Sequence, residues 1–184
     1  SPGSYRLGIR GNLLRSTFGV RNVKVYWNGL PFTDASGSTN FNAVAPAVIS
    51  SIEIIKGPSG SMYGAGTGGA VLLQSGAPSL TENNSISVAA SAGSYGTFSG
   101  NAQVILSKKN TTTFSIAHQQ ANGYRNHSAM KRDVALFTGS FHLSNNRKLN
   151  SLVFISHLFY ETPGGLTEAE LTANPRQARP AAGI

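Results

Sequence analysis

The sequence predicts a mainly β protein with minor helix, in which a small mixed sheet precedes the first antiparallel strands of a transmembrane β-barrel. Two observations predict the barrel strands. Ser, Thr, Asn and Gly alternate with Ile, Val, Phe and Leu, which suits a wall between lipid and a wet lumen. The stretches are long enough for tilted membrane-crossing strands of ~9–11 residues and too polar for a transmembrane helix. The stretches, which carry no charge and end where charged residues begin, are 85–106, 111–124, 134–146 and 149–160.

The first part of the chain predicts the small mixed sheet. Short apolar runs are separated by loops rich in Gly, Ser and Asn. The pair Asn28 and Gly29 supplies residues that tolerate positive φ, as a tight turn requires. A short helix or turn is expected over 43–49, with Asn42 as N-cap and Pro46 in the first turn. The expected strands are 5–9, 22–27, 51–56 and 68–74.

The second part predicts strands with short turns at one end and longer loops at the other. We expect 1–78 to form one domain, 79–84 a linker, and 85–184 the first ~5 strands of an incomplete barrel. Turns are expected at 108–110 and 144–148. The expected strands are 85–92, 98–107, 111–120, 133–143 and 149–160. The apolar positions expected to face lipid include Ile86, Val88, Val104 and Phe154.

Composition excludes several classes of function. The net charge of +8 is spread singly or in pairs at strand ends, so anionic head groups or an anionic ligand fit better than nucleic acid. The chain has no cysteine, and its four histidines lack metal-ligand spacing with a carboxylate. Nor do serine, histidine and acid combine at a catalytic spacing, so no enzyme is expected. The glycine run 64–69 is interpreted as close backbone approach to the barrel wall.

Three phrases carry a family resemblance. They are Leu-Gly-Ile-Arg-Gly at 7–11, Val-Lys-Val-Tyr-Trp-Asn-Gly-Leu-Pro at 23–31, and a Glu-Ile-Ile-Lys-Gly-Pro…Tyr-Gly…Gly-Gly run within 52–71. In this order they closely resemble the plug domain of TonB-dependent outer-membrane receptors, over about residues 4–78. The segment 92–96 is similar to the opening of the family's barrel.

The resemblance implies a receptor in the outer membrane of a Gram-negative bacterium, driven by the TonB energy-coupling protein. The segment that TonB grips is expected upstream of Ser1. Two residues depart from the family: Asn28 replaces its usual Asp, and Lys56 its usual Arg. The resemblance places Arg10 and Lys56 where the family's arginines face glutamates on the barrel, while Glu53 is an alternative partner within the plug.

The tail from 161 is similar to the third outer loop of the iron-siderophore and ferric-citrate branch. It implies a ferric chelate as transported ligand, with the metal held by the chelator and no cofactor. Arginines from several loops suit an anionic chelate, because they form charge-assisted hydrogen bonds. The candidate ligand-binding residues are Arg15, Arg21, Asp34, Ser36, Asn40, Arg125, His127 and Arg176.

Alternative functions remain open. The same architecture can import an oligosaccharide, a peptide or a corrinoid, and aromatic-rich outer loops would favour a sugar. An all-β surface binding module without transport would carry polar outward faces instead of lipid-facing apolar ones. A signalling receptor would need a further domain before the plug.

Overall fold

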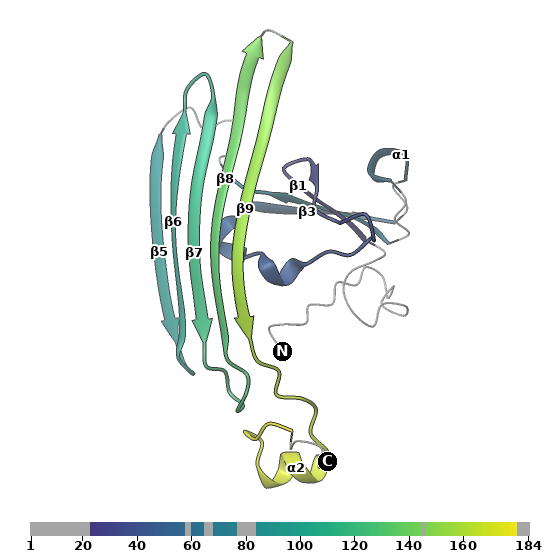
Figure 1. Ribbon diagram of the computed structural model, residues 1–184, viewed down its shortest axis with the longest axis vertical. Helices are drawn as coiled ribbons and strands as arrows, with labels where there is room; N and C mark the ends of the chain where they lie inside the picture. Colours follow the sequence, from purple (N-terminus) through teal and green to yellow (C-terminus); the bar gives the residue numbers. More distant parts are fainter. Residues whose placement is uncertain (1–22, 58–59, 65–67, 77–83, 145, 180–184) are drawn as a thin grey trace.

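The computed structural model describes residues 23–57, 60–64, 68–76, 84–144 and 146–179. Its largest element is a five-stranded antiparallel sheet in the order β5-β6-β7-β8-β9 (Figure 1). We call this sheet the wall. The strand predictions for 85–160 are confirmed, with each end placed within three residues. The strands are β5 (Ser85–Gly93), β6 (Thr97–Ser107), β7 (Thr111–Ala121), β8 (Met130–Ser144) and β9 (Arg147–Tyr160).

The second feature is a mixed sheet, as predicted, and its strands lie in the order β2-β1-β4-β3. The strand β2 was not predicted. Strand β1 runs parallel to β4, whereas the β1–β2 and β3–β4 pairs are antiparallel. Asn28 and Gly29 adopt φ of 49° and 81° between β1 and β2, as expected of a tight turn. The strand expected at 5–9 lies outside the described residues. The bounds are β1 (Val23–Trp27), β2 (Leu30–Pro31), β3 (Ser51–Lys56) and β4 (Gly69–Gln74).

Helices are short: η1 (Phe41–Ala43), η2 (Pro46–Val48), α1 (Gly60–Tyr63) and α2 (Glu168–Ala173). The segment expected as one helix or turn over 43–49 is two 3-10 turns. Pro46 holds Ala45 in an extended conformation (φ −82°, ψ 129°), so no helix runs through. Asn42 lies inside η1 and is not its N-cap, which is Asn40. Within the described ranges, no helix has the length and apolarity needed to span a membrane.

Strict alternation divides the residues of the wall between two faces. In β8, Val134 and Leu136 are buried towards the small sheet, while Ala135 between them is exposed. On the outward face Ile86 and Val88 are each 76% exposed, as expected, and Val104 pairs with Ile86. Other strongly exposed apolar side chains of this face include Leu106, Phe114, Ile116, Leu149, Val153, Ile155 and Phe159.

The expectation that Phe154 faces lipid is wrong. Phe154 is the register partner of Leu136, which is 3% exposed, and it lies on the inner face against the small sheet. Residues 152–155 of β9 are Leu, Val, Phe and Ile, so both faces of the strand are apolar there. Alternation of polarity therefore does not reveal which face is which.

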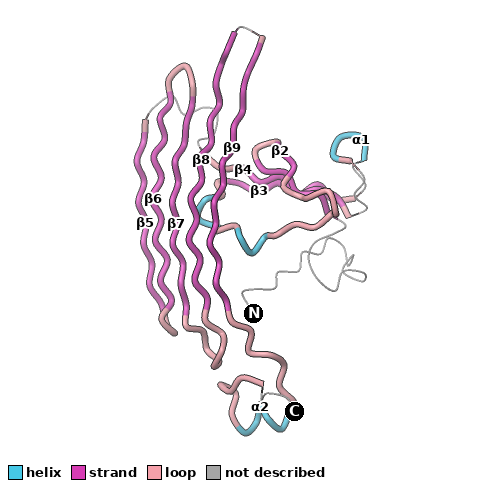
Figure 2. Tube along the Cα trace, in the orientation of Figure 1, coloured by secondary structure: helices cyan, strands magenta, loops and turns pink. Residues whose placement is uncertain are grey.

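The two sheets share one core. Val25, Trp27 and Leu73 of the small sheet belong to the same buried cluster as Val134 and Leu136 of the wall. Figure 2 shows the turns η1 and η2 (cyan) at the lower side of the small sheet, near the wall. The turn η2 contacts β7, and η1 contacts β9. The short helices therefore lie against the wall together with the apolar side chains of the small sheet.

Glycine permits close contacts at two of the described positions. The wall approach expected over 64–69 stays open at 65–67, which lie outside the described residues. At Gly69 (φ +120°) a Cβ would lie 2.0 Å from the carbonyl oxygen of Ile55, which belongs to β3 in the same sheet and not to the wall. A described approach to the wall occurs at Gly76 (φ +96°). A Cβ there would lie 3.0 Å from Oγ1 of Thr138 and 3.1 Å from Oγ1 of Thr113.

Candidate functional site

A buried arginine joins the wall to the small sheet. Arg132 of β8 is 2% exposed and lies on the inner face. Its Nη1 donates to the carbonyl oxygen of Asn42 at 3.1 Å and to that of Val44, and its Nη2 contacts Sδ of Met130 at 3.7 Å. Among the described residues, no carboxylate forms an ion pair with Arg132. Its charge is met by backbone carbonyls.

A serine of the next strand completes this contact. The hydroxyl of Ser156 in β9 donates to the carbonyl oxygen of Ala43 at 2.7 Å. The carbonyls of Asn42, Ala43 and Val44 therefore all accept hydrogen bonds from the wall. These carbonyls lie at the end of η1, where a helix leaves its acceptors unpaired. We call this set, Arg132 and Ser156 with the carbonyls of 42–44, the clasp.

An aromatic contact lies beside the clasp. The ring centroids of Trp27 and Phe154 are 4.9 Å apart, and Phe32 packs edge-on against Trp27 at 5.3 Å. Nε1 of Trp27 donates to Oγ of Ser75 at 2.8 Å. The indole therefore buries its apolar body against the wall and satisfies its N–H within the small sheet.

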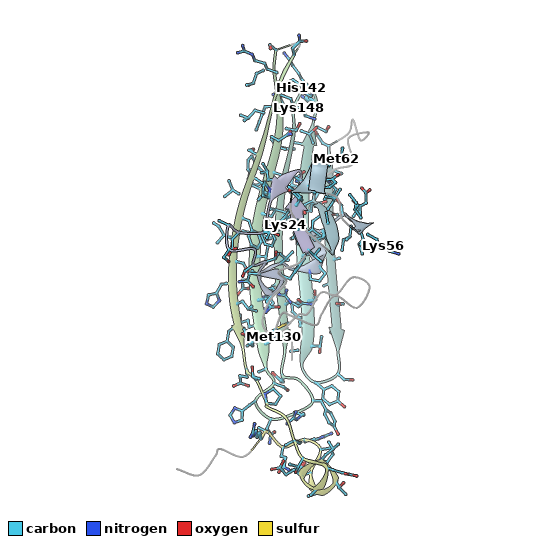
Figure 3. All side chains as sticks on the ribbon, turned by 90° about the vertical axis from the view of Figure 1, so that its right-hand side faces the viewer. Lys24, Lys56, Met62, Met130, His142 and Lys148 are labelled. Carbon is cyan, nitrogen blue, oxygen red and sulfur yellow. The ribbon has the colours of Figure 1, made fainter. Side chains whose placement is uncertain are left out.

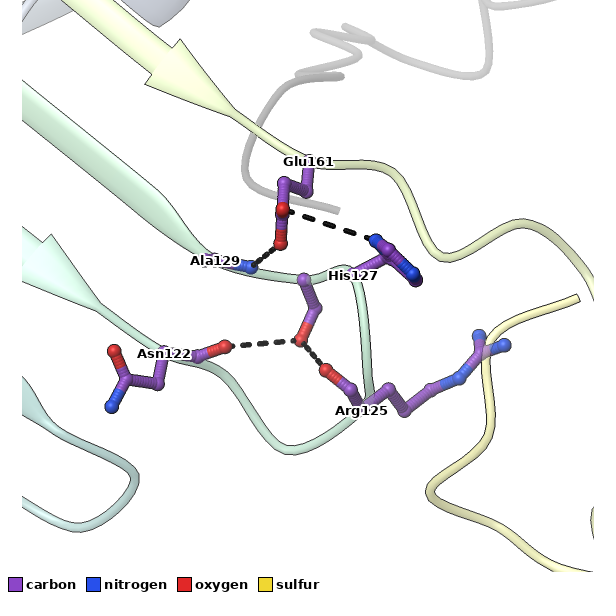
Figure 4. Close-up of polar contacts among 6 residues, drawn as sticks. Asn122, Arg125, His127, Ala129 and Glu161 are labelled. Atoms are coloured by element: carbon purple, nitrogen blue, oxygen red, sulfur yellow. Dashed lines mark hydrogen bonds and ion pairs between the residues drawn. The ribbon is translucent and has the colours of Figure 1, made fainter.

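The long-loop end of the wall forms a second cluster, part of which is drawn in Figure 4. Arg125 donates from Nε to the carbonyl of Gln177 at 3.0 Å, from Nη1 to that of Gly164 at 2.8 Å and from Nη2 to that of Pro163 at 3.3 Å. A carboxylate oxygen of Glu161 accepts from the backbone N–H of Ala129 at 3.2 Å. These contacts hold the loop after β7 against the loop after β9.

An exposed aromatic and cationic patch lies at the same end of the wall and includes the turn between β5 and β6. The rings of Tyr95 and Tyr124 meet edge-on at 5.5 Å, and Cζ of Arg176 lies 5.4 Å from the centroid of the Tyr124 ring. His127 (φ 54°) has a 72% exposed side chain, with Nδ1 3.9 Å from Oε1 of Glu161. The structure thus brings three expected ligand residues, Arg125, His127 and Arg176, into one group of loops.

The expected ligand residues of the small sheet lie in a separate turn. Oδ1 of Asp34 accepts from Oγ of Ser36 at 2.7 Å and from the N–H of Ser38 at 2.9 Å. These hydrogen bonds, that from Ser36 foremost, lower the pKa of Asp34. Asn40 is exposed. The carboxylate and hydroxyl of this turn are therefore engaged mainly with each other.

The remaining site predictions stay open. Arg10, Arg15 and Arg21 lie outside the described residues. Glu53 and Lys56 are exposed on β3 and make no ion pair with each other. Figure 3 shows Lys56 at the border of the small sheet, with His142 and Lys148 towards one end of the long strands and Met130 towards the other. In the described ranges, no three His, Asp or Glu side chains form a group suited to a metal ion.

Sequence reasoning missed the clasp. Residues 131–133 are Lys, Arg and Asp, and such a group of charges is typical of an exposed strand end. Alternation through Val134 and Leu136 places Arg132 alone of the three on the inner face. The alternation of apolar residues along this strand therefore predicts that Arg132 faces inward. The carbonyl partners were not predictable, because backbone acceptors carry no sequence signature.

Comparison with known proteins agrees with this architecture. Residues 1–71 match the family model of the TonB-dependent receptor plug domain. The pyoverdine outer membrane receptor FpvA from Pseudomonas aeruginosa PAO1, bound to pyoverdine, is similar in fold, with a TM-score of 0.61 and 18% identity over 78% of this chain and 23% of that chain. The ferripyoverdine receptor of the outer membrane of Pseudomonas aeruginosa gives 0.56 and 18%, over 76% of this chain and 20% of that chain.

The fold and the family match define a class: a plug packed by hydrogen bonds and apolar contacts against the opening strands of a β-barrel. Residues 1–71 match the plug domain of the TonB-dependent receptors, and the described fold resembles that of solved receptors of the bacterial outer membrane. They are receptors and transporters, not a class of enzyme. The chain spans less than a quarter of the length of the solved receptors that it matches.

Proposed function

We propose that the whole receptor binds a ferric-siderophore-type chelate at its outer face and imports it with energy from the TonB complex. The observation that carries this proposal is the combination of a plug-domain match over 1–71 with a fold like that of receptors described as bound to pyoverdine and ferripyoverdine. In this proposal 1–78 is the plug, 79–84 the linker, and 85–184 the first strands and outer loops of the barrel.

The outer-loop chemistry supports an anionic or aromatic chelate. Tyr95 and Tyr124 are 51% and 46% exposed, so their rings are available for stacking. Arg176 lies over Tyr124 and adds a cation to that surface. Arg15 and Arg21, from the plug, are proposed to approach the same ligand from below, with Asp34, Ser36 and Asn40 offering further polar groups.

Arg125 and His127 have different parts in this proposal. Each of the three guanidinium nitrogens of Arg125 donates a hydrogen bond to a loop carbonyl. Arg125 therefore shapes the site by holding the loops in place. His127 is exposed and free to meet a ligand. Arg10 and Lys56 are proposed as plug–barrel contacts whose partners lie on later barrel strands, with Glu53 as the alternative partner within the plug. The TonB protein is proposed to grip a segment upstream of Ser1.

The test is uptake by the full-length receptor in cells that lack their own iron receptors. The panel contains ferric chelates, with a corrinoid and oligosaccharides as controls. We expect energy-dependent uptake of one ferric chelate, with affinity reduced about tenfold by Arg176→Ala, since a partly desolvated cation–π or charge-assisted contact contributes ~1–2 kcal/mol. Arg147→Ala, at the first residue of β9 and the other end of the wall, is the matched control and should leave uptake unchanged.

A different cargo is the alternative with support in the structure. The edge-on pair of Tyr95 and Tyr124 also offers a surface on which a sugar ring can pack. Uptake of an oligosaccharide, peptide or corrinoid alone, abolished by Tyr124→Ala and insensitive to Arg176→Ala, would replace the iron proposal and keep the receptor.

A further inference from the structure

The clasp contains an unused donor, and an unused acceptor lies beside it. Gln119 of β7 and Arg132 of β8 are register partners on the inner face of the wall. Oε1 of Gln119 and Nε of Arg132 are both buried without a hydrogen-bond partner in the part of the chain that the structure describes. An acceptor and a donor on neighbouring side chains thus stand unpaired at the same place.

Two unpaired buried groups lower the stability of this state, which suggests that they form a hydrogen bond in another state of the receptor. A buried polar atom without a partner loses its hydrogen bonds to water and gains none in return, and the loss is larger when the atom belongs to a charged group. The guanidinium can supply five N–H donors. In this structure its orientation serves the carbonyls of Asn42 and Val44, which belong to the plug. Its neighbour in the wall, Gln119, accepts nothing at Oε1.

We propose that Arg132 is a latch with two positions. In the first, which the structure shows, it holds the carbonyls of Asn42 and Val44 and fixes the plug to the wall. In the second, occupied when segment 42–44 leaves the wall, the guanidinium turns to Oε1 of Gln119. The proposal rests on the proposed function, because it needs a plug that moves during import.

The second position lowers the free-energy cost of releasing the plug. At the first step of displacement, before water reaches the site, Arg132 would otherwise lose its acceptors while still buried. Gln119 replaces one of the lost acceptors within the wall itself. A carboxylate partner would hold the arginine more tightly in either position, and among the described residues Arg132 has none. Because the acceptors in both positions are neutral, the two positions of the Arg132 guanidinium differ little in free energy.

The plug side of the clasp can be followed by a single cysteine, because residues 1–184 contain none. In the full-length receptor, cleared of any further cysteine, Ala43→Cys places a thiol in the clasp segment. Its rate of reaction with a maleimide, in outer membranes at rest and during energised import, reports detachment of 42–44 from the wall. Hydrogen exchange of the amides of 41–48 in the cysteine-free receptor is the second measurement, should the cysteine disturb folding.

Three variants distinguish the two positions. Arg132→Met should raise the labelling rate at rest by roughly tenfold, because the plug carbonyls lose charge-assisted hydrogen bonds. Gln119→Leu should leave the rate at rest unchanged and reduce the increase on energising about tenfold, because only the released state loses an acceptor. Lys131→Met, which removes the neighbouring outward-facing cation, is the matched control and should alter neither rate.

Each contrary result has a defined meaning. An unchanged rate at rest in Arg132→Met overturns the latch, whatever the cargo. A Gln119→Leu receptor that labels faster at rest, or that responds normally to energy, overturns the second position. If no ferric chelate is imported while Arg132→Met still labels faster at rest, the cargo proposal fails and the first position of the latch is supported. The two proposals therefore fail separately.

Discussion

The indole of Trp27 lies 4.9 Å from the ring of Phe154, with the planes tilted by 59°. Trp27 ends a strand of the plug sheet, and Phe154 belongs to the barrel strand β9. Their contact extends the buried core across the boundary between plug and barrel. Apolar packing therefore acts beside the hydrogen bonds of the clasp in holding the plug.

Removal of the Phe154 ring should loosen the plug. We expect Phe154→Ala to destabilise plug docking by about 2 kcal/mol, since it removes a half-buried ring and an aromatic pair. Faster hydrogen exchange of residues 23–27 in the full-length receptor would measure this. Ile155→Ala, whose side chain is 67% exposed on the opposite face, should leave that exchange unchanged. Equal effects of the two variants would argue against the contact.

Asn28 should be better than aspartate at its position in this chain. Its Oδ1 accepts from the N–H of Ser75 at 2.8 Å, and its Nδ2 donates to the carbonyl of Ser75 at 3.1 Å. Asn28→Asp keeps the acceptor and the turn preference but loses the donor, at a cost of about 1 kcal/mol. Protease resistance of the plug is the measurement. Asn28→Ala, which also puts alanine at positive φ, should cost more, and a reversed order would contradict this account.

Arg125 should order the outer loops even when no ligand is bound. Arg125→Met removes hydrogen bonds to the carbonyls of Pro163, Gly164 and Gln177, so exchange of amides in 161–179 should rise several-fold in the ligand-free receptor. Arg176→Met removes a cation lying over Tyr124 and should leave most of that exchange unaltered. An unaffected loop in Arg125→Met would show that these bonds do not order it.

Helix α2 should become less stable in acid. Thr167 and Glu170 form a capping box, in which the carboxylate accepts from the N–H and hydroxyl of Thr167 at 2.8 Å and 2.9 Å. These hydrogen bonds lower the pKa of Glu170 from its ordinary 4.5. A depressed folded pKa means that the stabilisation is present above pH 4.5 and is lost as pH falls through the folded pKa.

The measurement is amide exchange in 168–173 against pH, corrected for the intrinsic rate. Protection should fall below pH 4.5 in the natural chain, and the Glu170→Gln variant should lack this dependence. The same pH dependence in Glu170→Gln would assign it to another group. Glu168, which makes no capping-box contact, provides the matched control as Glu168→Gln.

Much of the fold followed from the sequence because local rules govern it. Uncharged alternating stretches and the charges between them predicted the five wall strands closely, because charged side chains remain in water at turns and strand ends. Asn28 and Gly29 defined the first hairpin through their tolerance of positive φ. The family phrases placed the plug, and the family model for 1–71 confirms that recognition.

Tertiary structure alone decided which side chains meet across the boundary. Phe154 was misplaced because β9 is apolar on both faces, and only packing against Trp27 selects one. A described approach to the wall lies at Gly76, where Thr113 and Thr138 meet the backbone, whereas residues 65–67 of the run 64–69 lie outside the described residues. Arg132 finds its partners among the carbonyls of 42–44, far away in sequence. Local pattern fixes the strands, whereas non-local contacts depend on how the two sheets dock.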